Sequence, residues 1–257
     1  MSFLKGGILF SDMVTTVSKR YSQEIQTAEY GHGLEGVLLG CRKKLHGIPN
    51  GIDYRLWNPA VDSYLPAHYS PEDLSGKREC KTALQERVGL PVRENVPLFG
   101  MISRLADQKG FDLITDIAEE LLSMELQWIL LGRGDQRYEN FFWEIAKRYP
   151  QKISVNLIDD ESLAHQIEGG CDLFLMPSKY EPCGLNQLYS LKYGTIPLVR
   201  ATGGLDDTVR DLNPVTEEGT GFKFREYSAG SLMECVKRAL LVYHHPSLWY
   251  KLMHQAM

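Results

Sequence analysis

The sequence predicts an α/β fold in which a doubly wound parallel sheet is covered by helices on both faces. Short apolar runs recur along the chain, for example at residues 97–102 and 128–131, and glycine or polar residues bound them. Continuous apolar runs of this length are typical of strands buried on both faces. The segments between them carry apolar residues on one helical stripe, as residues 111–122 do. Strands that alternate with helices in this way indicate a parallel sheet.

The regular pattern occupies residues 91–257, which we expect to form one Rossmann-like domain. Each strand is predicted from an apolar run and each helix from the spacing of its apolar residues. In chain order the predicted elements are a strand at 97–102, a helix at 111–122, a strand at 128–131, a helix at 137–149, a strand at 152–157, a helix at 162–168, a strand at 172–176, a helix at 185–193, a strand at 196–199 and a helix at 228–243.

The segments before this domain are less regular. Residues 1–60 combine a β-branched run at 13–18, predicted to be a strand, with a polar stretch at 21–30 that we interpret as a helix. An Asn-Gly pair at 50–51 favours a tight turn. Residues 61–90 contain prolines and polar residues, and we interpret them as a linker or surface excursion that includes a helix.

Composition and charge limit the classes of function. A net charge of −5 disfavours nucleic acid as the main partner, because phosphate backbones attract basic surfaces. The five cysteines are scattered without a C-x-x-C pair, which argues against a disulfide framework or a structural zinc site and suits a reducing compartment. No apolar run is close to the length of about 20 residues that a membrane-spanning helix needs. The first residues of the chain lack the pattern of a signal peptide. We therefore expect a cytoplasmic protein with no membrane partner.

Ligands of doubly wound sheets bind beyond the carboxyl ends of the strands, so the loops that follow the predicted strands are candidate sites. In the loop at 103–109, Arg104 and Lys109 place two cations just before a helix, whose N-terminus adds positive potential. An arginine fork and a mobile lysine charge together suit a diphosphate. The spacing of these two residues is weak evidence by itself, and a solvated basic loop is the alternative interpretation.

Two further loops combine glycine with polar groups. The loop at 177–184 holds Glu181 beside Pro182, so that a rigid carboxylate faces the same edge of the sheet and can accept hydrogen bonds from sugar hydroxyls. Alternatively, Glu181 is a first-turn residue favoured by the helix dipole. The turn at 202–204 suits close backbone approach to a phosphate. Three such loops on one sheet indicate a binding site more strongly than any one of them.

These loops lie within longer motifs that resemble those of the bacterial glycogen synthases and plant starch synthases. The resemblance also extends to the first part of the chain, which is similar to the end of that family's N-terminal domain, so it covers essentially the whole sequence. The matching segments are S-R-x-x-x-Q-K-G from Ser103, P-S-x-x-E-P-C-G-L-x-Q-L-Y from Pro177, L-K-Y-G-T-x-P-L-V-R-x-T-G-G-L-x-D-T-V from Leu191, and residues 3–8, 12–18 and 47–53.

The resemblance implies a GT-B fold, with two Rossmann-like domains facing a cleft. It also implies transfer of glucose from ADP-glucose to the non-reducing end of an α-1,4-glucan, with retention of configuration and without a metal or other cofactor. Arg104, Lys109 and Glu181 would be catalytic: the two cations neutralise the departing diphosphate, and Glu181 holds glucose hydroxyls and helps to stabilise an oxocarbenium-like centre. The predicted substrate-binding residues are Gly132, Cys183, Gly184, Leu185, Asn186, Thr202, Gly203 and Gly204.

The sequence departs from the family pattern in places. The acceptor-side K-x-G-G loop and the catalytic His and Asp of the N-terminal domain are absent, so we expect residues 1–60 to be the tail of that domain and the chain to be the donor-binding part. Ile158-Asp159 stands where a Gly-Tyr pair is usual, which leaves the choice between ADP- and UDP-glucose open.

Two alternatives remain. One is another retaining GT-B glycosyltransferase, although Tyr189 stands where many of those enzymes carry a second glutamate. The other is a catalytically inactive fragment that binds nucleotide or glucan. The sequence predicts no oligomeric state.

Overall fold

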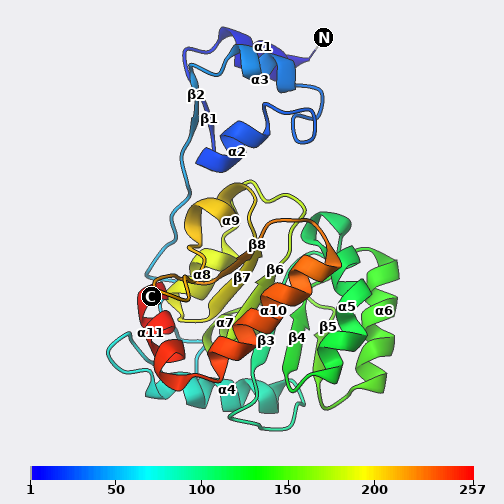
Figure 1. Ribbon diagram of the computed structural model, residues 1–257, viewed down its shortest axis with the longest axis vertical. Helices are drawn as coiled ribbons and strands as arrows, with labels where there is room; N and C mark the ends of the chain where they lie inside the picture. The colour runs from blue at the N-terminus through cyan, green and yellow to red at the C-terminus, as the bar shows by residue number, and fades with distance from the viewer. Residues whose placement is uncertain (1) are drawn as a thin grey trace.

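Six parallel strands form the main sheet in the computed structural model, which describes residues 2–257. The spatial order is β5-β4-β3-β6-β7-β8, and every neighbouring pair is parallel. This arrangement confirms the predicted doubly wound sheet (Figure 1). The strands are β3 (Leu98–Ile102), β4 (Gln127–Leu131), β5 (Ile153–Asn156), β6 (Leu173–Met176), β7 (Ile196–Arg200) and β8 (Phe222–Phe224).

Helices cover both faces of this sheet. Alternate residues of each central strand point to opposite sides, and both sets are apolar, so both faces need to be covered. Trp128 and Leu130 of β4 pack on the face covered by α5, α6 and α10, whereas Ile129 and Leu131 pack on the face covered by α4 and α7. All four side chains are buried. The helices are α4 (Ser75–Arg87), α5 (Phe111–Ser123), α6 (Gln136–Arg148), α7 (Glu161–Gly170), α8 (Asn186–Lys192), α9 (Gly203–Thr208), α10 (Ala229–Tyr243) and α11 (Pro246–Ala256).

The strand order reverses between β3 and β6. The chain runs outward from β3 to β4 and β5, returns to β6 beside β3, and then runs outward the other way through β7 and β8. The loops that leave β3 and β6 therefore diverge, which opens a crevice at the carboxyl ends of these two strands. Two of the loops singled out in the sequence, 103–109 and 177–184, follow these strands.

The segment before β3 is packed against the domain and is not a free linker. Trp57 stacks between His165 and Tyr189, with ring centroids 3.8 Å from each. Buried Asp62 accepts a hydrogen bond from Tyr193 and lies 2.7 Å from His165 Nδ1. These partners lie more than 100 residues further along the chain, so the prolines of this segment indicate a loop but not where it docks.

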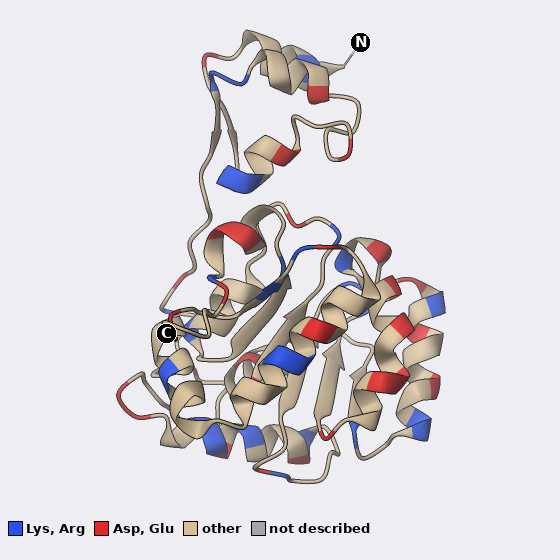
Figure 2. Ribbon diagram, in the orientation of Figure 1, with Lys and Arg blue, Asp and Glu red and all other residues tan. Residues whose placement is uncertain are grey.

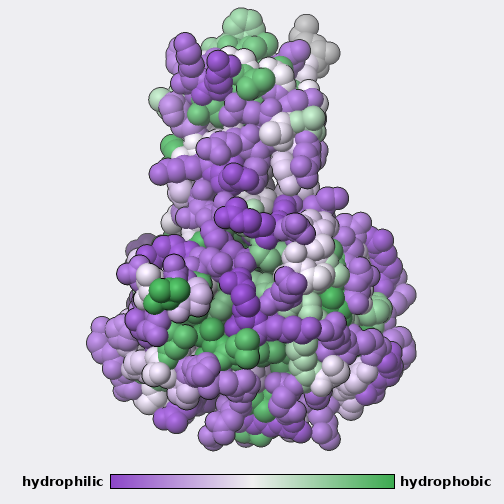
Figure 3. Space-filling model, in the orientation of Figure 1, coloured by the Kyte–Doolittle hydropathy of each residue, from purple (hydrophilic) through white to green (hydrophobic). Residues whose placement is uncertain are grey.

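Residues 2–48 form a smaller unit, here called the N-terminal body. It contains a two-stranded parallel sheet and a small core of Ile8, Leu38 and Leu45. In the figures it is the narrower lobe beyond α9, and polar residues predominate where it meets the larger domain (Figures 1 and 3). Its elements are α1 (Phe3–Phe10), β1 (Val14–Thr16), α2 (Lys19–Glu24), α3 (Glu35–Gly40) and β2 (Leu45–Gly47).

Several elements of the structure differ from the predicted ones. The helix expected at 21–30 is the shorter α2. Helix α1 was not predicted: it buries only Ile8 among its described residues, so its apolar residues do not form a clear helical stripe. Helix α11 was also not predicted, although Pro246 stands in its first turn, where proline is favoured.

Candidate active site

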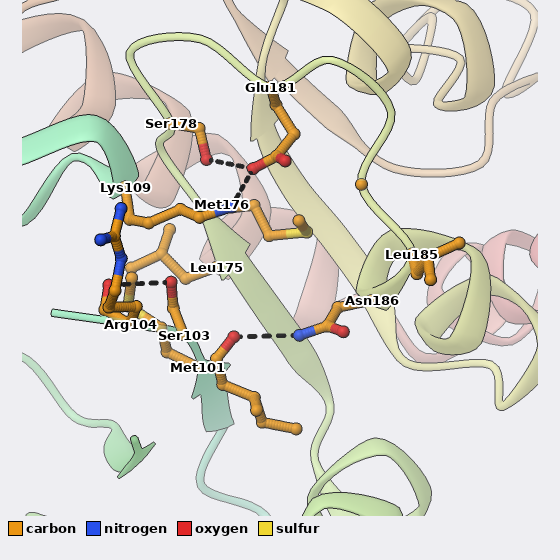
Figure 4. Close-up of a pocket in the computed structure, with 12 residues that line it drawn as sticks. Met101, Ser103, Arg104, Lys109, Leu175, Met176, Ser178, Glu181, Leu185 and Asn186 are labelled. Atoms are coloured by element: carbon orange, nitrogen blue, oxygen red, sulfur yellow. Dashed lines mark hydrogen bonds and ion pairs between the residues drawn. The ribbon is translucent and has the colours of Figure 1, made fainter. Parts of the chain in front are cut away.

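A cavity of about 350 Å³ lies where the strand order reverses, between the ends of β3 and β6. Figure 4 shows its polar side chains pointing toward one another from the two loops. Arg104, Lys109, Glu181, Gly184, Leu185 and Asn186, all predicted site residues, line this cavity together with Met101, Ile102, Ser103, Leu175, Met176 and Ser178.

Backbone contacts hold the two loops together. The N–H of Lys179 donates to the carbonyl of Gln108 over 2.8 Å. Gly110 has a φ of 80°, and a Cβ there would lie 2.3 Å from the carbonyl oxygen of Pro177, so only glycine permits this contact. The loop after β3 is thereby fixed directly against the loop after β6.

The short 3-10 turn at Asp107–Lys109 is anchored on its outer side. Asp107 accepts hydrogen bonds from Tyr138 and Arg137 of α6, and these two bonds lower the pKa of its carboxyl below the ordinary value. The hydroxyl of Tyr227 donates to the backbone carbonyl of Asp107 over 3.2 Å. The anchored turn presents Lys109 to the cavity.

Arg104 is exposed at the cavity mouth. Its guanidinium donates to Gln108 Oε1 over 3.3 Å, and no carboxylate within the described residues forms an ion pair with it. Lys109, by contrast, lies with its Nζ 2.6 Å from Glu181 Oε2. The cavity thus contains one cation without a carboxylate partner and one that is already paired.

Glu181 is the buried acidic group of the site, with 6% of its surface exposed. Its Oε2 accepts from Lys109 and, over 3.1 Å, from Ser178 Oγ. No protein donor among residues 2–257 hydrogen-bonds to Oε1, so one carboxylate oxygen stays available for a ligand hydroxyl. Ser178 was quoted within the sequence motif but was not predicted as a site residue; its position directly after a strand and three residues before Glu181 is the signal that could have identified it.

The start of α8 closes the cavity on one side. Gly184 has a φ of 71°, which turns the backbone into the helix. No side chain caps the first N–H groups of α8. Asn186 donates from Nδ2 to the carbonyl of Ile102 over 2.9 Å, which fastens the helix to the end of β3.

Gly132 lies in a second cavity, of about 570 Å³, that shares Ile102, Ser103 and Arg104 with the first. A Cβ at Gly132 would lie 2.0 Å from the carbonyl oxygen of Ser103, and its φ is 138°. The lining of this second cavity also includes Ile158, Asp159, Asp160, Glu161 and Ala164. The two cavities thus adjoin at the end of β3 and at Arg104.

Four of the predicted substrate-binding residues lie outside both cavities. Cys183 is buried, and the turn of Thr202, Gly203 and Gly204 packs behind the loop that carries Glu181. The glycines of this turn allow close approach of another backbone segment: a Cβ on Gly203 would lie 1.9 Å from the carbonyl oxygen of Glu181. The N–H of Gly203 is bonded to the carboxylate of Glu24.

Acidic and basic residues are interspersed over the outer helices (Figure 2). Within residues 2–257 there is no group of three or more His, Cys, Asp or Glu side chains arranged to hold a metal ion. None of the helices in the described part of the chain has the length and apolarity needed to cross a membrane.

A doubly wound sheet with two cations and a buried carboxylate at its switch point has the architecture of one Rossmann-like half of a GT-B glycosyltransferase. The family model for glycosyl transferases group 1 matches residues 84–248, and the chain belongs to this family. A second model, for the starch synthase catalytic domain, matches residues 1–40.

The chain is also similar to individual glycogen and starch synthases, which confirms the resemblance read from the motifs. It is 49% identical to a glycogen synthase of Koribacter versatilis and 50% identical to one of Thermotoga petrophila, in each case over 100% of this chain and 53% of the relative. Among solved structures, the catalytic domain of starch synthase IV from Arabidopsis thaliana, bound to ADP and acarbose, superposes with a TM-score of 0.93 at 38% identity, covering 99% of this chain and 53% of that one. The chain thus spans about half the length of these relatives.

Proposed function

We propose that this chain is the donor-binding part of a glycogen or starch synthase, which transfers glucose from ADP-glucose to the non-reducing end of an α-1,4-glucan with retention of configuration. The observation that carries this proposal is the convergence of Arg104, Lys109 and Glu181 on one cavity at the switch point of the sheet. The similarity to glycogen synthases supports the same assignment.

In this proposal Arg104 and Lys109 bind the diphosphate. As the bond between glucose and the diphosphate breaks, negative charge grows on the departing ADP, and two fixed cations stabilise that charge more than they stabilise the intact donor. These cations would take the part that a divalent metal takes in other diphosphate chemistry, so the proposed reaction uses no metal or cofactor.

Glu181 is proposed to bind the glucose. Its free Oε1 can accept from a sugar hydroxyl while Oε2 stays bonded to Ser178, so the carboxylate is already oriented before the sugar arrives. A negative charge at this position also favours the positive charge that develops on the anomeric carbon. Gly184, Leu185 and Asn186 would line the sugar and phosphates from the start of α8.

The second cavity is proposed to receive the nucleoside. It shares Arg104 with the first cavity and is lined further by Gly132, Ile158 and Asp159, so a nucleoside attached to a diphosphate at Arg104 would find space there. Exposed Ile158 offers an apolar surface for the base. The solved starch synthase contains ADP, which favours adenine here, and acarbose, which favours an oligosaccharide acceptor.

Tyr189 gives a reason to prefer this branch over other retaining GT-B enzymes. Its ring is stacked on Trp57 at 3.8 Å, so the position supplies an aromatic packing contact and no carboxylate for a ribose. We also propose that the protein works in the cytoplasm, where its five free cysteines, four of them buried, would stay reduced.

Calorimetric titration with ADP and ADP-glucose, beside incorporation of labelled glucose into glycogen, tests the proposal. We expect binding by the chain and a loss of about tenfold or more in ADP affinity for Arg104→Ala, because a charge-assisted contact to phosphate is removed. Arg148→Ala is the matched control, since this exposed arginine at the end of α6 pairs with Glu119 of α5, outside both cavities. Absence of ADP binding would refute the proposed function. Binding without glucose transfer would instead support the alternative of a binding fragment.

A further inference from the structure

We propose that Glu24, in the N-terminal body, is a positioning residue that orients Glu181 through the turn at Thr202–Gly204. This inference rests on the proposed function, in which Glu181 binds the glucose. It concerns a part of the chain that lies outside both cavities and that no sequence motif assigned to the site.

Glu24 is inserted between the two parts of the molecule. It is the last residue of α2, it is 8% exposed, and its carboxylate accepts hydrogen bonds from the Thr202 hydroxyl and the Gly203 N–H at 3.1 to 3.2 Å. Arg20, one turn earlier on the same helix, donates to Glu24 from Nε over 3.2 Å. The Glu24 carboxylate therefore caps the start of α9, and Arg20 of the N-terminal body holds the carboxylate in place.

The turn that Glu24 holds lies in direct contact with the backbone of the Glu181 loop. The N–H of Gly204 donates to the carbonyl of Glu181 over 3.0 Å. A Cβ on Gly203 would lie 1.9 Å from that carbonyl oxygen, and a Cβ on Gly204 would lie 2.0 Å from the carbonyl oxygen of Cys183. Because no space separates the two segments, a shift of the turn must shift the Glu181 backbone.

Arg200 makes a second connection between the N-terminal body and the loop that carries Glu181. Arg200 is 7% exposed and donates from Nε to the carbonyl of Ser178 over 2.9 Å, and also to the carbonyl of Lys179. The same guanidinium donates to the hydroxyl of Tyr30, in the N-terminal body, over 3.2 Å. The Glu181 loop is thus held on both sides of Glu181 by groups that the N-terminal body contacts.

The consequence is a selective effect on the sugar. Arg104, which is proposed to bind the diphosphate, belongs to the loop after β3. Within the described residues its side chain donates to Gln108 and forms no hydrogen bond with Glu24 or Arg200. Loosening the Glu24 contact therefore displaces Glu181 and weakens its pairing with Lys109, while the diphosphate contact of Arg104 stays in place. The sugar loses its carboxylate partner, whereas ADP keeps Arg104 and gains a less tightly paired Lys109. A residue that only stabilised the fold would not separate the two ligands in this way.

Calorimetry on the whole chain tests the proposal, with ADP and ADP-glucose as probes. For Glu24→Ala we expect ADP-glucose affinity to fall about tenfold, the size of the charge-assisted hydrogen bond that Glu181 is proposed to make to the sugar, while ADP affinity is kept or rises by a few fold at most. Glu24→Gln keeps one oxygen acceptor for the turn and should restore much of the loss. Asp12→Ala is the control, because Asp12 is an exposed carboxylate of the N-terminal body and forms no ion pair within the described residues.

Equal losses for ADP and ADP-glucose, or an unchanged ADP-glucose affinity, would overturn the proposal. If Glu24→Ala does not fold, Thr202→Val decides the question, because it removes one donor to Glu24 at nearly constant volume and should give a smaller loss of the same selectivity. If the unmodified chain binds neither probe, the proposed function fails, and that outcome is distinct from a failure of the coupling.

Discussion

The ammonium of Lys109 lies 2.6 Å from Oε2 of Glu181, so the cation proposed to receive the diphosphate and the carboxylate proposed to receive the sugar are bound to each other. The two residues come from the loops after β3 and β6, 72 positions apart in the chain. Each is held in place before a ligand arrives. A ligand that carries both a diphosphate and a sugar offers a new partner to each of them, whereas ADP offers a partner only to Lys109.

The first prediction follows from this pairing. Glu181→Gln removes the charge that competes for Lys109, so we expect ADP affinity to rise by about two- to tenfold and ADP-glucose affinity to fall. Calorimetric titration of both ligands measures the two effects. Glu144→Gln is a suitable control, since it breaks a surface pair with Lys147 on α6. A fall in ADP affinity for Glu181→Gln would contradict the idea that the two groups compete.

The sheet and the positions of its loops could be predicted from the sequence, because strands buried on both faces are continuous apolar runs. The rule for ligand sites in such sheets then placed Arg104, Lys109 and Glu181 at one edge. The turn at 202–204 was assigned to phosphate because a glycine pattern shows that some group approaches the backbone closely but does not say which group. In the structure that group is the Glu181 carbonyl.

The docking of residues 57–69 could not be predicted for a different reason. Trp57 and Asp62 contact His165 and Tyr193, which lie more than 100 residues further along the chain. The spacing of apolar residues within a segment predicts its local structure but not a contact with a segment so distant in the sequence. Glu24 is a similar case: its neighbours in the sequence are polar, and its role depends on a turn about 180 residues later.

The second prediction concerns Asp62. Burial opposes its ionisation, but hydrogen bonds from His165, Tyr193 and the Tyr64 N–H outweigh that effect and lower its pKa. Asp62→Ala leaves buried partners without an acceptor, so we expect a loss of about 2–4 kcal/mol in the free energy of unfolding. The stabilisation should be complete above the ordinary carboxyl pKa of about 4 and disappear as the pH falls below it.

Urea unfolding at pH 7 and at acidic pH measures this effect. Asp53→Ala is the matched control, because Asp53 forms an exposed pair with Arg55 and its removal should leave the midpoint unchanged. If Asp62→Ala were as stable as the unmodified chain, the segment before β3 would not be docked as the structure describes.

The third prediction concerns the N-terminal body. Its core has three buried apolar residues, while Phe3, Phe10 and Met13 are exposed by 91%, 90% and 62%. With so little apolar surface buried, we expect its amides to exchange with solvent much faster than those of β3 and β4. Hydrogen exchange followed by mass spectrometry measures this directly. Exchange in residues 2–48 as slow as in the central strands would show that the unit is more stable than its core suggests.

The fourth prediction concerns the pH dependence caused by Lys77. This residue is buried, donates to the carbonyls of Gly169 and Tyr193 and to the hydroxyl of Thr195, and burial lowers the pKa of its ammonium to about 8. Between pH 8 and its unfolded pKa of about 10.4, the unfolded chain retains a proton that the folded chain has released. The free energy of unfolding contributed by Lys77 therefore rises with pH across that window.

Buried cysteines and tyrosines have raised pKa values and act in the opposite direction at alkaline pH, as burial does for Cys171 and Tyr69. The total stability therefore hides the effect, and the difference between the unmodified chain and Lys77→Met isolates it. We expect this difference to increase by up to about 3 kcal/mol from pH 7.5 to pH 10. Urea unfolding of both proteins at several pH values gives the curve. A difference that stays flat or falls would show that Lys77 keeps its proton in the folded state, with its charge stabilised by the surrounding carbonyls and nearby Asp172 and Glu168.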